Sequence, residues 1–188
     1  MTSQPPVPIQ LKHAHTVYQN QFVTVHDDEV VFPSGNTGTY LRIVESDGSP
    51  GVAALVTRGR DIALVHVYRY PIRAWEWGIP RGFASSADPQ TSMLRELREE
   101  LGAKPHQLKL IGRVHANSGL LAGVVLIYHA VIGEGQTHPA DSAEVDAVAW
   151  VSIDEVLAMI GEGRITDGFT LAALTLASIH KVISELDH

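Results

Sequence analysis

The sequence of 188 residues contains no cysteine. Disulfide bonds, thiolate metal sites and a cysteine nucleophile are therefore excluded, and any chemistry must use carboxylates, histidines, hydroxyls or an oxygen-ligated metal. The sequence also lacks an uninterrupted apolar run of the roughly 18 residues that a membrane span needs. Its first residues lack the basic-then-apolar order of a signal peptide. We therefore expect no membrane partner and a cytoplasmic location.

Positive charge is scarce as well. The chain has 14 Lys and Arg against 21 Asp and Glu, a formal charge of -7. Without an excess of cations to neutralise phosphates along a backbone, we expect no nucleic-acid partner. The hydrophobic fraction of 45% in a chain of this length can bury a sizeable core, which suits one domain with a small appendage.

The order of the predicted elements indicates the fold class. Residues 1–14 contain the run PPVP and no periodic pattern, so we expect a disordered lead-in. Residues 15–46 alternate apolar and polar positions around a glycine-rich turn, which predicts a β-hairpin subdomain. Residues 47–188 form the main domain. Its predicted strands cover 52–57, 62–70, 108–114, 124–132 and 145–151, and its predicted helices cover 89–101, 153–160 and 167–186.

Strands, one helix, further strands and two final helices do not fit a doubly wound parallel sheet, which needs a helix after nearly every strand. The order favours an α/β (α+β) fold in which a mixed β-sheet is sandwiched between helices (α/β/α). The small antiparallel N-terminal β subdomain precedes this sandwich.

The chemical information is densest in the segment RELREELG, residues 95–102. At about 100° per residue, Glu96, Glu99 and Glu100 share one face of the predicted helix, and the leucines occupy another. Three crowded carboxylates repel one another and need a counter-charge. Arg95 can supply part of it, and a hard cation such as Mg²⁺ or Mn²⁺ is typical of an all-oxygen set. The alternative is a solvated helix face held by an Arg95–Glu99 pair.

The segment WEWGIPRGF, residues 75–83, precedes this helix and is rich in aromatic, proline and glycine residues. Such a rigid segment can present backbone carbonyls beside the carboxylates.

At these residues the chain resembles the Nudix hydrolase family, whose signature is G-x5-E-x7-R-E-U-x-E-E-x-G-U with U aliphatic. Gly82 corresponds to the first glycine, and residues 95–103 match the second half without a gap. The interval from Gly82 to Arg95 is one residue shorter than the pattern, and Ala87 or Asp88 replaces its first glutamate. The resemblance implies a Nudix fold with a metal held mainly by the glutamates of the second half.

Two further segments resemble the ADP-ribose pyrophosphatase branch of this family. Residues 68–73 read YRYPIR and residues 162–171 read EGRITDGFTL, whereas Gly78 stands where the branch often has Glu. The branch implies Mg²⁺-dependent (Mn²⁺ is possible) hydrolysis of the diphosphate bond of a nucleoside diphosphate linked to another moiety, such as ADP-ribose or a related nucleotide sugar.

The resemblance also implies roles for individual residues. The metal ligands would be Glu96, Glu99, Glu100 and the carbonyl oxygen of Arg81. Arg69 and Arg81 would contact the substrate. Glu99 would act in catalysis through the metal, and Glu144, in the polar loop before the strand at 145–151, would orient or deprotonate the attacking water.

Other readings stay open at this point. The shortened loop and Gly78 would also suit a catalytically weak Nudix-like domain that binds a nucleotide metabolite as a sensor or interaction module. We also expect a homodimer, because the predicted hairpin over 17–44 would expose a face bearing Phe22, Val25, Val31 and Tyr40. The resembled pyrophosphatases use this region in a swapped dimer. A hairpin that folds back on its own domain is the alternative.

Overall fold

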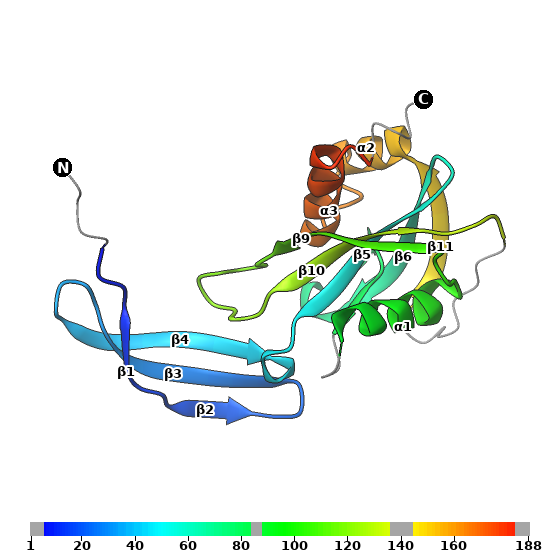
Figure 1. The fold of residues 1–188 in the computed structure, drawn as a ribbon. Coiled ribbons are helices and arrows are strands. Elements are labelled where there is room, and N and C mark those ends of the chain that lie inside the picture. The colour runs from blue at the N-terminus through cyan, green and yellow to red at the C-terminus, as the bar shows by residue number, and fades with distance from the viewer. Residues whose placement is uncertain (1–5, 84–87, 136–144, 183–188) are drawn as a thin grey trace, which may run out of the picture. The chain divides into compact units, whose positions relative to one another are not determined.

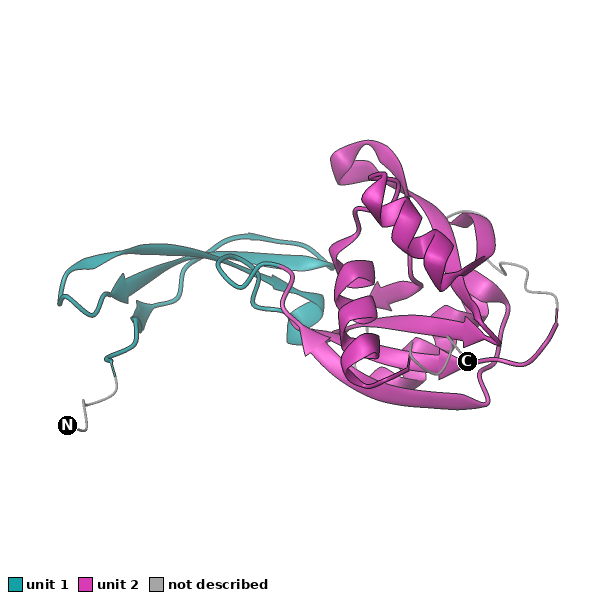
Figure 2. Cartoon of the chain, turned by 90° about the horizontal axis from the view of Figure 1, so that it is seen from above, with its two compact units in different colours: residues 1–49, 117–123 teal, residues 50–116, 124–188 magenta. Residues whose placement is uncertain are grey.

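The structure is a computed structural model and describes residues 6–83, 88–135 and 145–182. The chain divides into two compact units, which we describe separately (Figure 2). Unit 1 comprises residues 1–49 and 117–123, and unit 2 comprises residues 50–116 and 124–188. Within the described ranges, no helix combines the length and the apolar character needed to cross a membrane.

Unit 1 is an antiparallel sheet built around a long central strand, β3. Its elements are β1 (Gln10–His13), β2 (Thr16–Gln19), β3 (Val23–Val31), β4 (Thr37–Glu45) and the 3₁₀ turn η1 (Ser46–Gly48). β4 pairs with the whole length of β3, while β1 and β2 share the other edge. The expected disordered lead-in over 1–14 is therefore wrong for residues 10–13. A strand of four residues is too short to show an alternation of apolar and polar positions in the sequence. β1 forms through its backbone pairing with β3.

The register of β3 and β4 also corrects the expected apolar face. Asp28 pairs with Tyr40, whereas Val25 pairs with Ile43 and Val31 with Thr37. Directly paired residues project to the same side and neighbours alternate, so Tyr40 lies on the opposite face from Val25 and Val31. The Tyr40 face instead carries an ion pair, in which Nε of Arg42 donates to Oδ2 of the buried Asp28 at 2.7 Å.

This ion pair predicts an acid-sensitive unit 1. The Arg42 hydrogen bond lowers the pKa of Asp28 below its ordinary value of 3.8. Because the pKa is lower in the folded chain, the stabilisation is complete above pH 3.8 and is lost as the pH falls through the folded pKa. We expect the urea midpoint, followed by circular dichroism, to fall less between neutral and acid pH in Asp28→Asn than in the parent. An equal fall in both would contradict the prediction, and Asp27→Asn is the control.

Unit 2 contains the mixed sheet and the three α-helices found in the described residues (Figure 1). Its strands are β5 (Gly51–Arg58), β6 (Asp61–Arg69), β7 (Ala74–Gly78), β8 (Arg81–Phe83), β9 (Gln107–Val114), β10 (Val125–Val131) and β11 (Val145–Ser152). Its helices are α1 (Pro89–Leu101), α2 (Ile153–Gly161) and α3 (Gly168–Ile179), with the 3₁₀ turn η2 at Tyr70–Ile72. The main strand order is β11-β6-β5-β10-β9, in which β5 and β10 run parallel.

Two hydrophobic layers hold the helices against this sheet. On one face α1 contributes Met93, Leu97 and Leu101 to a core with alternate residues of β5 and β6. On the other face α2 and α3 pack against the remaining alternate residues, including Leu55 and Leu64. The predicted mixed sheet between helices is confirmed, because β5 and β6 are apolar on both faces and so bury both.

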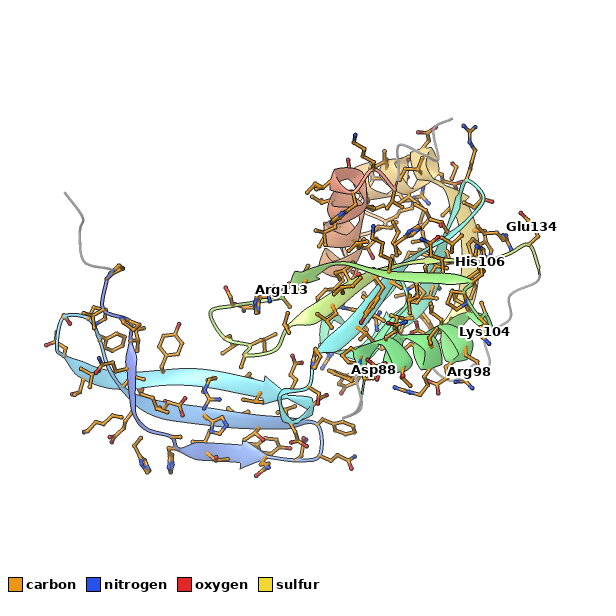
Figure 3. The ribbon with its side chains drawn as sticks, viewed as in Figure 1. Asp88, Arg98, Lys104, His106, Arg113 and Glu134 are labelled. Carbon is orange, nitrogen blue, oxygen red and sulfur yellow. The ribbon has the colours of Figure 1, made fainter. Side chains whose placement is uncertain are left out.

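Capping residues define both ends of α1. Asp88 is the N-cap of α1 and accepts hydrogen bonds from the backbone N–H groups of Gln90 and Thr91. Gly102 ends the helix with a φ of 65°, in the left-handed region that favours glycine. Asp88 lies at the start of α1 and Arg98 farther along it (Figure 3). α3 is shorter than the predicted 167–186: Asp167 is its N-cap and the helix ends at Ile179.

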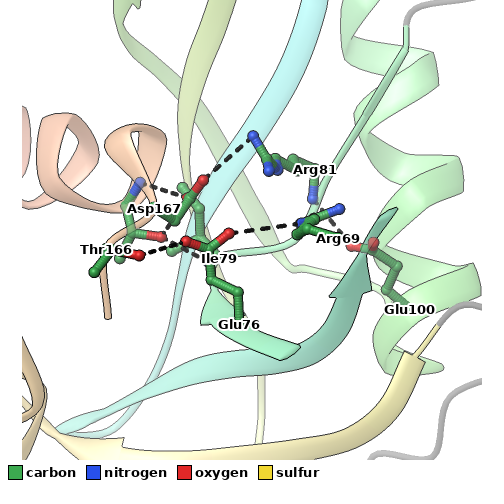
Figure 4. Close-up of polar contacts among 8 residues, drawn as sticks. Arg69, Glu76, Ile79, Arg81, Glu100, Thr166 and Asp167 are labelled. Atoms are coloured by element: carbon green, nitrogen blue, oxygen red, sulfur yellow. Dashed lines mark hydrogen bonds and ion pairs between the residues drawn. The ribbon is translucent and has the colours of Figure 1, made fainter. Parts of the chain in front are cut away.

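A fork in the sheet positions the candidate site. β5 and β6 pair directly only beside their turn, at Thr57↔Ile62 and Arg58↔Asp61. Farther from the turn β8 pairs with β5, and β7 pairs with β6. These two short strands were not predicted as such, because proline and glycine interrupt the segment that contains them. Arg69, at the end of β6, and Arg81, at the start of β8, lie in the same region of the fork (Figure 4).

Candidate active site

The acidic face of α1 is partly buried and held by one arginine. Glu96 and Glu100 are buried, and Glu99 is half-buried. Nη1 of Arg95 donates to Oε2 of Glu99 at 2.8 Å, and Nη2 donates to Oε1 of Glu96 at 2.5 Å. The Arg95–Glu99 contact follows from helical spacing. The contact with the adjacent Glu96 does not, because neighbouring residues on a helix do not face each other.

The β8 strand packs closely on these carboxylates. A Cβ atom on Gly82 would lie 2.1 Å from Cδ of Glu96, so only glycine leaves room for the carboxylate in this position. The backbone N–H of Arg81 donates to Oε2 of Glu100 at 3.0 Å. The β8 backbone and the α1 carboxylates therefore lie in direct contact, as the sequence-based hypothesis of a carbonyl ligand requires.

These residues fit a hard divalent cation by the chemistry of their donors. Glu96, Glu99 and Glu100 supply carboxylate oxygens, and the neighbouring β8 backbone supplies carbonyl oxygens. Within the described part of the chain, no group of three or more His, Asp or Glu is already arranged to hold a metal. The Arg95 guanidinium forms ion pairs with two of the three carboxylates, Glu96 and Glu99.

Two arginines lie beside the acidic face, and each has a carboxylate partner (Figure 4). Nη1 of Arg81 is 3.3 Å from Oδ1 of Asp167, and Nε of Arg69 is 3.9 Å from Oε2 of Glu76. The other oxygen of Glu76 accepts a hydrogen bond from Thr166 at 2.8 Å. Burial, and then the charge of Arg81, lower the pKa of Arg69. Arg69 Nε is buried and has no hydrogen-bond partner among the described residues.

The structure thus brings together five of the six residues named from the sequence: Glu96, Glu99, Glu100, Arg69 and Arg81. Glu144, the sixth, lies outside the described residues. Sequence reasoning missed Glu76 and Asp167 as neighbours of the arginines. The resemblance at residues 162–171 includes Asp167, but nothing in the local pattern connects it with Arg81.

The candidate site thus consists of an acidic helix, a glycine packed against its carboxylates, and two arginines, and known proteins with similar sequences identify its family. The model of the NUDIX domain matches residues 48–169. The chain belongs to the NUDIX family. The match spans β5 to the start of α3 and so includes every described residue of the candidate site.

Curated relatives of this NUDIX protein carry several different names. It is 24% identical to a CMP-5'-(N-acetyl-N-hydroxy-3-aminopropyl)phosphonate hydrolase of Streptomyces rubellomurinus, over 87% of this chain and 79% of the relative. It is 27% identical to a methanol dehydrogenase activator of Bacillus methanolicus, over 89% of this chain and 91% of the relative. It is 23% identical to an ADP-ribose pyrophosphatase of Mycobacterium tuberculosis, over 90% of this chain and 82% of the relative.

A solved structure described as an ADP compounds hydrolase shares the fold of this NUDIX protein. The TM-score is 0.78 at 16% identity, over 94% of this chain and 95% of that one. The predicted family, fold class and assignment as a pyrophosphatase-type hydrolase are therefore confirmed.

Proposed function

We propose that this NUDIX protein hydrolyses the diphosphate bond of a nucleoside diphosphate linked to another moiety, with ADP-ribose or a related nucleotide sugar as the substrate and Mg²⁺ as the cofactor (Mn²⁺ is possible). One observation carries the proposal. The three glutamates of α1 lie against β8, and two arginines lie beside them in the same fork of the sheet. Carboxylates that can hold a metal, next to guanidinium groups that can bind phosphate, suit a diphosphate substrate.

The roles follow from the chemistry of each group. Glu96, Glu99, Glu100 and the carbonyl oxygen of Arg81 would hold Mg²⁺, which when bound supplies positive charge for the diphosphate and lowers the pKa of water. Arg69 and Arg81 would bind phosphate oxygens through their N–H groups. Arg95 would orient Glu99. Glu144 would orient the attacking water or take its proton, and this role rests on its place in the sequence.

The test is a panel of nucleoside diphosphate derivatives, assayed with Mg²⁺ for the monophosphate products. We expect turnover of at least one nucleotide sugar and its loss when a chelator removes the metal. Binding of a panel member without any product would support the sensor reading instead. An absence of both binding and turnover would contradict the two readings together.

We further propose that the protein is a homodimer with an interface built partly from residues 17–44. Residues 15–46 would form the N-terminal β subdomain, and residues 47–188 the hydrolase domain. The support is exposed apolar surface in this subdomain: Val17, Tyr18 and Phe22 are 52%, 55% and 61% exposed. Exposed apolar side chains of this kind are typical of a surface that contacts a partner. Light scattering should give twice 20.4 kDa. A monomer at micromolar concentration would contradict the dimer, and a dimer that survives deletion of residues 1–44 would contradict this interface.

A further inference from the structure

The first turn of α3 contacts Arg81 through two side chains. Asp167, the N-cap of α3, is 5% exposed, and its two oxygens have different partners. Oδ2 accepts from the backbone N–H and the hydroxyl of Thr170, at 2.9 and 2.7 Å. Oδ1 lies 3.3 Å from Nη1 of Arg81. The cap thus fixes the carboxylate on the helix, and the remaining oxygen faces the guanidinium.

A second contact from the same turn restrains Arg81. Its guanidinium carbon lies 4.9 Å from the centre of the Phe169 ring, within the range of a cation–π interaction. Thr170 also accepts a hydrogen bond from the backbone N–H of Ile79 at 3.0 Å, which joins α3 to the connection between β7 and β8. Arg81 is therefore restrained by two side chains of α3, while its own backbone contacts Glu100.

Gly78 is explained by this packing. It does not have the positive φ that would require glycine. A Cβ atom there would lie 3.2 Å from Oδ2 of Asp167 and 3.2 Å from the Thr170 hydroxyl, closer than side chains normally approach. The missing side chain at Gly78 therefore leaves room for the hydrogen bonds between Asp167 and Thr170 that cap α3.

We propose that Asp167 is a positioning residue, which holds the Arg81 guanidinium beside Arg69 so that both can bind one phosphate of the substrate. This rests on the proposed function. Two neighbouring guanidinium groups repel each other, so without a fixed carboxylate Arg81 would turn away from Arg69. The α3 cap keeps them together, and Arg69 Nε is a buried donor without a hydrogen-bond partner among the described residues.

The test measures binding of inorganic pyrophosphate by calorimetry, in the presence of Mg²⁺, for the full chain and for Asp167→Asn. Asn keeps an oxygen that can cap α3 but loses the charge that holds Arg81. We expect Kd to rise about tenfold, as for the loss of one charge-assisted hydrogen bond. In an Arg81→Met background the same substitution should change Kd by less than about twofold, because the residue that it positions is gone. Ser152→Ala removes the α2 cap and should leave Kd unchanged.

Other results of these binding measurements overturn the proposal. Tighter binding by Asp167→Asn would mean that the carboxylate only screens Arg81, and an equal loss in both backgrounds would mean a purely structural role. If Asp167→Asn does not fold, Gly78→Ala is the second variant: it shifts the contacting Asp167 and Thr170 side chains by a few tenths of an ångström without removing the carboxylate. It must then raise Kd only when Arg81 is present. Failure of the parent to bind pyrophosphate would also overturn the proposal. Pyrophosphate binding without turnover of the nucleotide panel would count against the proposed function alone.

Discussion

Replacing Glu100 by Gln should lower kcat by about three orders of magnitude, the size expected when an electrostatic interaction with the reacting phosphates is lost. Gln has the same size, and its carbonyl oxygen can still accept the Arg81 N–H that Glu100 accepts at 3.0 Å. The substitution therefore removes the charge and leaves the contact between β8 and α1. Glu99→Gln should have an effect of similar size, because Glu99 is on the same helix face.

Thermal unfolding provides a second measurement for this prediction. Mg²⁺ or Mn²⁺ should raise the melting temperature of the parent relative to chelator, because a cation that binds only the folded chain stabilises it by mass action. The rise should be absent in Glu100→Gln. Glu155→Gln, on the exposed side of α2, is the matched control and should retain both activity and the thermal response. Parent-like turnover in Glu99→Gln and Glu100→Gln would contradict the catalytic role proposed for these carboxylates.

Gly82→Ala should reduce kcat/KM by about a hundredfold, with a much smaller effect on folding. The new Cβ atom would lie 2.1 to 2.5 Å from the carboxyl atoms of Glu96, so that carboxylate must move. The carboxylate of Glu96 is at the end of a flexible side chain, so rotation of that side chain can relieve the clash without a shift of the backbone. Displacement of a proposed metal ligand by about 1 Å is nevertheless enough for a loss of this size.

The measurement combines steady-state kinetics with the melting temperature in the absence of metal. Gly161→Ala is the control, because a Cβ atom there meets nothing within 4 Å and the residue lies outside the site. It should be neutral or slightly stabilising. An active Gly82→Ala enzyme with an unchanged response to Mg²⁺ would show that the position of Glu96 does not matter for the reaction.

Local pattern determined much of unit 2. The helix over Pro89–Leu101 has the predicted bounds, because the spacing of Met93, Leu97 and Leu101 and the stop at Gly102 are properties of the helix itself. The bounds of the longer strands of unit 2 agree with the predicted ranges within one or two residues, because their runs of apolar residues are also a local property of the sequence. β1, β7 and β8 were not predicted, because each has five residues or fewer and depends on pairing with a longer strand.

The sequence by itself thus determined the acidic face of α1 and its family signature, since both depend on residues within a few positions of one another. Only the tertiary structure decided what surrounds that face. Glu76 contacts Thr166 across 90 positions, and Arg81 contacts Asp167 although neither sequence neighbourhood indicates the other. Gly78 and Gly82 are close to side chains of the α3 cap and of α1, and neither has a positive φ that would favour glycine. Contacts between distant residues depend on how the sheet forks and how the helices pack, and a local period contains no information about either.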